Sequence, residues 1–159
     1  MAKSPSGAAP APLKIRIIDQ QEALALDYRW LKELARSVLT AEKVPQARIN
    51  VVLMTDAAIH VQNRRFLHHD EPTDVLTFPL SPPGAKRLEA EILISTETAR
   101  AAAAEHGGHP PAHEVALYLV HGLLHLCGYD DHDEADRATM RRREAELLAA
   151  AGIHLATDF

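Results

Sequence analysis

The sequence has little aromatic content, only one cysteine and no long apolar run. A single cysteine excludes an intramolecular disulfide framework and leaves a reducing compartment open. No apolar stretch reaches the roughly 18 residues that a membrane-spanning helix needs. The first residues, Met1–Pro5, lack the apolar segment of a secretory signal peptide. We therefore expect a cytoplasmic protein with no membrane partner.

The chain also has fewer positive than negative side chains. It has 17 lysines and arginines and 22 aspartates and glutamates, so the net charge is −5 with histidine neutral. This balance argues against bulk coating of nucleic acid, which needs a basic surface, but it leaves room for a local basic groove. With 159 residues, 47% of them hydrophobic, the chain is long enough for one domain with a core of its own.

The pattern of apolar residues predicts an α+β fold. Residues 1–12 are rich in alanine, proline, serine and glycine and are expected to form a disordered tail, followed by a single domain over 13–155. Strands are expected at 14–19, 48–54, 75–78 and 90–95, and helices are expected to begin near 27, 55, 96, 110 and 133. This order predicts helices packed on a mixed β-sheet.

Three of the ten histidines lie within residues 121–132. His121 and His125 are four residues apart, so a helix places both imidazoles on one face, one turn apart. Their neighbours are apolar, and two imidazoles in an apolar helix are costly unless their ring nitrogens are satisfied. A zinc ion satisfies them directly. We therefore predict a metal site, holding one Zn²⁺, on a buried C-terminal helix.

Two residues compete for the place of the third ligand. Gly128 is expected to end the helix and turn the chain back, which brings either Asp131 or His132 near the histidine pair. The spacing from Gly128 favours Asp131, whereas the readiness with which zinc takes imidazole favours His132. Three protein ligands with an open fourth position are typical of a catalytic zinc.

The residue after the first histidine separates two classes of hydrolase. Zinc peptidases with the H-E-x-x-H motif carry a glutamate there as general base, whereas this chain has Gly122. A zinc metalloprotease-like hydrolase therefore remains only as an alternative, because the chain has the histidines of the metal site but not the glutamate that acts as general base in that class.

Three segments carry a resemblance to a known family. Residues 121–130, HGLLHLCGYD, resemble the signature of the YbeY family of bacterial endoribonucleases, and residues 70–79, DEPTDVLTFP, and 90–95, AEILIS, resemble two further segments of it. The resemblance implies a zinc-dependent, single-strand-specific endoribonuclease acting in rRNA processing, including maturation of the 16S rRNA 3′ end, and in ribosome quality control. It implies RNA rather than DNA as substrate, with the small ribosomal subunit and assembly factors as partners. A non-catalytic ribosome-assembly factor with a structural metal is a further alternative.

Two features of the family pattern differ in this chain. The family's third histidine directly follows Gly-Tyr-Asp, whereas here Asp131 stands between that segment and His132. Members with an arginine three residues before the first aspartate of the 70–79 segment use it as a catalytic or phosphate-contacting residue, and here that position is Leu67. Arg64 and Arg65 lie just upstream, so either can supply the phosphate contact, for which the guanidinium fork is suited. The alternative is that both are solvated residues at a helix end.

Three further features have more than one interpretation. Glu114, two turns before the histidine pair, is either a support for a ligand histidine or, by preference, a solvated acid. Arg141–Arg143 could contact RNA, but Glu144 and Glu146 follow at once, which favours a solvated helix face. Cys127 is expected to be a buried, unreactive thiol.

Overall fold

A computed structural model describes residues 12–67 and 74–155. The elements follow one another as β1 (Leu13–Asp19), α2 (Tyr28–Ala41), β2 (Ala47–Met54), α3 (Asp56–Leu67), β3 (Val75–Pro79), β4 (Leu88–Ser95), α4 (Thr96–Glu105), α5 (Pro111–Leu126) and α6 (Glu134–Ala150). Except for Pro12, the predicted disordered tail lies outside the described residues. Of the 70–79 segment, residues 70–73 also lie outside them.

The four described strands form one mixed sheet in the order β1-β2-β4-β3. β1, β2 and β4 run parallel to one another, and β3 pairs antiparallel with β4 at the edge of the sheet. The structure thus confirms the predicted α+β fold with helices on a mixed sheet. None of the described helices is long and apolar enough to cross a lipid bilayer.

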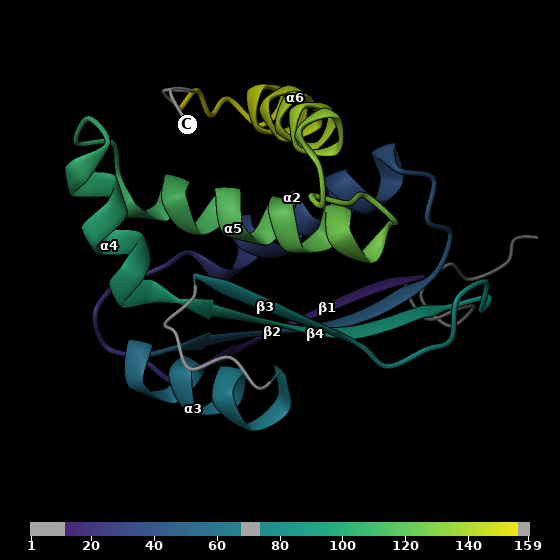
Figure 1. Ribbon diagram of the computed structural model, residues 1–159, viewed down its shortest axis with the longest axis horizontal. Coiled ribbons are helices and arrows are strands. Elements are labelled where there is room, and N and C mark those ends of the chain that lie inside the picture. The colour runs from purple at the N-terminus through teal and green to yellow at the C-terminus, as the bar shows by residue number, and fades with distance from the viewer. Residues whose placement is uncertain (1–11, 68–73, 156–159) are drawn as a thin grey trace, which may run out of the picture.

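Helices cover both faces of the sheet (Figure 1). α2, α5 and α6 lie on one side, and α3 lies on the other. The alternation of side chains along β2 explains the two layers, because Val51 and Leu53 enter the main core while Val52 and Met54 pack in a second, smaller core with Ile59 of α3. The sheet therefore lies between the core around α5 and the smaller core around Ile59 of α3.

Side-chain caps begin three of the helices, close to the expected positions 27, 96 and 133. Asp27 accepts a hydrogen bond from the backbone N–H of Trp30 and begins α2, and Ser95 does the same for α4 through the N–H of Thr98. Asp133 begins α6 by accepting from the N–H of Asp136. Side-chain oxygens at these positions satisfy N–H groups that have no partner inside the helix.

α5 is the central helix and contacts α2, α4, α6, β3 and β4. It begins after Pro110, with a proline in its first turn, where the missing N–H costs nothing. Gly122 faces the sheet so closely that a Cβ atom there would lie 3.1 Å from Cγ2 of Thr77 and 3.2 Å from Cγ2 of Ile92. Glycine at this position therefore allows α5 to lie directly on β3 and β4.

Candidate metal centre

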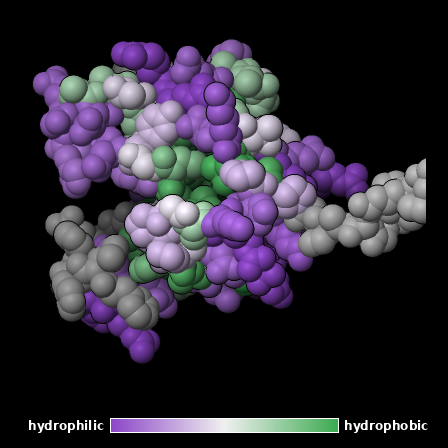
Figure 2. Space-filling view, turned by 90° about the vertical axis from the view of Figure 1, so that its right-hand side faces the viewer, coloured by the Kyte–Doolittle hydropathy of each residue, from purple (hydrophilic) through white to green (hydrophobic). Residues whose placement is uncertain are grey.

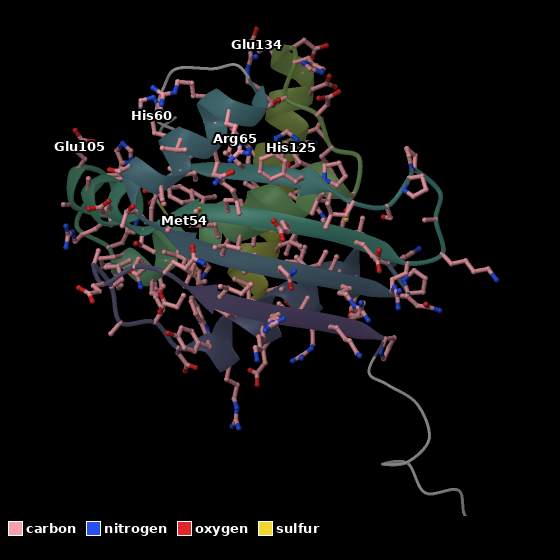
Figure 3. All side chains as sticks on the ribbon, turned by 90° about the horizontal axis from the view of Figure 1, so that it is seen from below. Met54, His60, Arg65, Glu105, His125 and Glu134 are labelled. Atoms are coloured by element: carbon pink, nitrogen blue, oxygen red, sulfur yellow. The ribbon has the colours of Figure 1, made fainter. Side chains whose placement is uncertain are left out.

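His121 and His125 occupy one face of α5, as their spacing predicts. Their ring centroids are 4.7 Å apart, and the rings meet edge to face at 82°. Both side chains are partly buried, with 29% and 27% of their surface exposed. Figure 3 shows His125 with the other side chains on the ribbon. Two imidazoles this close are suited to share one ion.

Glu144 of α6 orients His121. Its carboxylate lies 2.5 Å from Nδ1 of His121, and the glutamate is only 7% exposed. A carboxylate accepts hydrogen bonds, so Nδ1 donates its proton and Nε2 keeps its lone pair for a ligand. Burial opposes protonation of the ring, but the hydrogen bond and charge of Glu144 outweigh it, and the pKa of His121 is raised.

The turn after α5 orients His125 in the same way. Gly128 has a φ of 101°, a conformation that favours glycine. The chain turns back there, and Nδ1 of His125 donates a hydrogen bond to the backbone carbonyl of Tyr129 at 3.1 Å. Because a carbonyl only accepts, Nε2 is again the nitrogen that remains for a ligand.

Asp131 completes a group of three possible ligands. Its Oδ2 lies 3.5 Å from Nε2 of His125, and the ligand atoms of His121, His125 and Asp131 all lie within 4.8 Å of one another. Two ligands at about 2.0–2.2 Å from a tetrahedral ion stand about 3.4 Å apart. The donor set of two imidazole nitrogens and one carboxylate therefore fits a zinc ion in chemistry, and the separation of Asp131 and His125 suits two ligands of one ion.

His132, the competing residue, lies further from the pair. Its side chain is 82% exposed, and its Nε2 is 3.1 Å from Oδ1 of Asp130. It belongs to a second possible group, with Asp130 and Asp131, in which all three residues are exposed. Exposed acidic groups of this kind are common without an ion, so the geometry favours the group that contains both helix histidines.

A cleft of about 290 Å³ opens beside the three-residue cluster. One side is formed by α5, including Tyr118 and His121, and the other by α6, including Arg137 and Arg141. Asp74, just before β3, and Asp131 also line it. This size is near the lower end for a small-molecule pocket, and it suits one group of a larger substrate.

Arg64 and Arg65 lie on α3, on the other side of the sheet from α5 (Figure 1). Figure 3 labels Arg65 on α3 and His125 on α5. Both arginines are exposed, and neither is among the residues that line the cleft. Their phosphate contact stays a prediction.

The interpretation of Glu114 as a solvated acid is wrong. Glu114 is 4% exposed, and its carboxylate lies 2.7 Å from Nε2 of His109, not beside a ligand histidine. It also accepts a hydrogen bond from Tyr118, whose pKa is strongly raised by burial and by that negative neighbour. A buried carboxylate needs such partners to be tolerated.

Arg141 and Arg142 are exposed, as a solvated helix face predicts, but Glu144 on the same helix is buried and is the main feature of the site that the sequence did not predict. Its helix position carried a usable signal, because Met140, Leu147 and Leu148 are also buried and lie three or four residues away. An acid on the apolar side of a helix needs a buried partner. Arg143 is not simply solvated either, since its guanidinium contacts Glu42 at 2.7 Å.

Comparison with known proteins shows the family of this chain. The model of the family described as Endoribonuclease YbeY matches residues 16–152. The chain is 41% identical over 140 residues to the endoribonuclease YbeY of Chloroflexus aggregans, covering 82% of this chain and 91% of that protein. It is 39% identical over 140 residues to the protein of the same name from Anaeromyxobacter dehalogenans, covering 87% and 72%.

A solved structure has the same fold. The solution structure of TM1509 from Thermotoga maritima superposes with a TM-score of 0.59 at 25% sequence identity, over 87% of this chain and 91% of that one. The family match spans every strand and helix from β2 to α6 and most of β1. The chain belongs to the YbeY endoribonuclease family.

Proposed function

We propose that this protein is a zinc-dependent endoribonuclease that cuts single-stranded RNA during rRNA processing. The observation that carries the proposal is the paired orientation of His121 and His125, each with Nδ1 donating to a fixed acceptor and Nε2 left for a ligand. Support from hydrogen-bonded partners of this kind is typical of metal-binding histidines. Family membership supplies the reaction class, cleavage of RNA.

The proposed ligands are His121, His125 and Asp131. The 3.5 Å separation of Asp131 and His125 suits two neighbouring zinc ligands, whereas His132 is turned toward Asp130. Three protein ligands would leave a fourth coordination position for water or substrate. A structural metal held by four protein side chains receives no support from the described residues, because the group that contains the two helix histidines has three members.

The residues of this chain set up the reaction by orientation. Glu144 keeps the proton of His121 on Nδ1, and the carbonyl of Tyr129 does the same for His125. Zinc in this position would supply an activated water molecule or polarise a phosphate oxygen. Arg64 or Arg65 remains a candidate for a phosphate contact from outside the cleft.

The packing of Gly122 also argues against the peptidase alternative. Gly122, which replaces the general base of that class, lies against Thr77 and Ile92, so a side chain there would enter the sheet contact. This leaves RNA as the preferred substrate. We propose that the protein acts in the cytoplasm on rRNA of the small ribosomal subunit, including the 16S 3′ end, and in ribosome quality control, alongside assembly factors.

The test compares His125→Ala with His106→Ala, a substitution of an exposed histidine at the end of α4. Zinc content and cleavage of a single-stranded RNA are measured on both variants. We expect His125→Ala to lose bound zinc and cleavage together, while His106→Ala keeps both. Full zinc content with full cleavage in His125→Ala would reject the proposal.

A further inference from the structure

We propose that Arg137 and Arg141, the α6 arginine pair, bind the backbone phosphates of the RNA strand beside the metal centre. The inference rests on the proposed function and adds the element that holds the substrate. Both residues line the cleft that also contains His121 and Asp131. They are four residues apart on α6, so the helix places them on one face, one turn apart.

Arg137 contacts the backbone of the segment that carries Asp131 and His132. Its Nη1 lies 3.3 Å from the backbone carbonyl of Asp131 and 3.5 Å from that of His132. One nitrogen of the guanidinium is thus directed toward the segment that carries the proposed third ligand. A guanidinium has five N–H donors in a planar fork, so a contact through one nitrogen leaves others for a phosphate.

The charges around the cleft favour a phosphate at this place. Glu144 faces His121 at 2.5 Å, and Asp131 faces His125 at 3.5 Å. Two of the acids that line the cleft therefore have imidazole partners. Asp74 is a third acid of the cleft lining, and the arginine pair supplies cationic side chains to it from α6, the helix that also carries Glu144. Bidentate contacts between arginine and phosphate are among the stronger hydrogen bonds in proteins.

The other two arginines of α6 differ in position. Arg143 contacts Glu42 at 2.7 Å and Glu146 at 3.6 Å. Arg142 is exposed and does not line the cleft. In Figure 2 hydrophilic residues predominate over the upper part of the molecule, where α6 lies. Because the whole chain carries a net charge of −5, a polyanion is held by such a local group and not by the surface as a whole.

The experiment compares Arg141→Gln with Arg142→Gln, which removes the same charge from the next residue of the same helix. Binding of a fluorescent single-stranded RNA is measured by anisotropy at several salt concentrations, and cleavage kinetics are measured on the same zinc-loaded proteins. Each arginine that no longer binds a phosphate is expected to lower the slope of log affinity against log salt by about 0.7. We expect Arg141→Gln to raise KM roughly fivefold, about the net effect of one typical hydrogen bond, with kcat nearly unchanged.

The double variant Arg137→Gln/Arg141→Gln is expected to lower the salt slope by about 1.4, twice the single effect. Zinc content and the thermal melting curve are recorded for every variant, so that a loss of metal or of fold is recognised. Arg142→Gln is expected to match the wild type in slope and in KM.

Three results would overturn the inference. An unchanged KM and salt slope in Arg141→Gln, beside normal cleavage by the wild type, would reject the arginine pair and leave the proposed function standing. Equal effects of Arg141→Gln and Arg142→Gln would mean that only the overall charge of α6 matters. A zinc-loaded wild type that neither binds nor cleaves single-stranded RNA would reject the inference and the proposed function together.

Discussion

Glu144 on α6 and His121 on α5 are joined by a hydrogen bond of 2.5 Å between side chains that are 23 residues apart in the sequence. The bond fixes which nitrogen of His121 is available to a ligand. It also couples the packing of the last helix to the orientation of the candidate metal centre, because Glu144 lies among Met140, Leu147 and Leu148 on the buried side of α6.

Replacing Glu144 by glutamine keeps the shape of the side chain and removes its charge. We expect Glu144→Gln to lower zinc affinity by about tenfold, within the range known for partners of metal-binding histidines. Competition with a chelator of known affinity measures the change. Glu146→Gln, on the exposed side of the same helix, is the matched control and should bind zinc like the wild type. Equal zinc affinity in both variants would show that Glu144 does not support the centre.

The third ligand is identified by two neighbouring substitutions. We expect Asp131→Ala to lose zinc and RNA cleavage, because the carboxylate belongs to the same group of ligand atoms as both helix histidines. His132→Ala should keep both, since His132 is 82% exposed and contacts Asp130. Elemental analysis of the purified variants gives the zinc content. The reverse pattern, with zinc lost only in His132→Ala, would assign the position to His132.

The sequence predicted the local parts of this site better than the long-range ones. The spacing of His121 and His125 and the turn at Gly128 depend on residues close together in the chain, and the structure has the helix and the turn where they were expected. The contact between Glu144 and His121 joins two helices, and no local pattern specifies which residue of one helix meets which residue of the other.

The placement of Arg64 and Arg65 depends on the same kind of long-range information. Both lie near the segment that resembles the family's phosphate-contacting region, but whether α3 packs above or below the sheet is decided by the side-chain alternation of β2 and β4 and by the crossover between them. Val52, Met54 and Leu93 form the lower face against Ile59 of α3. The phosphate contact of Arg64 or Arg65 stays a prediction, and the structure has two further arginines, Arg137 and Arg141, lining the cleft.

Gly122 is expected to be a packing residue. In Gly122→Val the new Cβ atom would lie 3.1 Å from Cγ2 of Thr77 and 3.2 Å from Cγ2 of Ile92, closer than ordinary van der Waals contact. We expect the free energy of unfolding to fall by about 1–3 kcal/mol, as overpacking usually costs. Ala104→Val, on the exposed side of α4, controls for the helix propensity of valine and should cost about 0.5 kcal/mol. Urea unfolding compares the two, and equal destabilisation would contradict the close contact.

Cys127 is expected to react slowly with alkylating reagents. Burial, followed by the negative charge of Glu42, raises the pKa of its thiol to about 11. The thiolate is the reactive form, so labelling near neutral pH should be roughly 100-fold slower than that of free cysteine. The rate should rise with pH up to about 11. Because the chain has a single cysteine, mass spectrometry follows this thiol alone, and labelling as fast as that of free cysteine would contradict the raised pKa.

Removal and return of the metal tests the central claim, that His121, His125 and Asp131 hold an ion on which RNA cleavage depends. The protein is stripped with a chelator and titrated with zinc while cleavage of a single-stranded RNA is followed. We expect cleavage to disappear with the metal and to return in proportion to zinc up to one ion per chain. Cleavage that continues unchanged in fully stripped protein would contradict the claim.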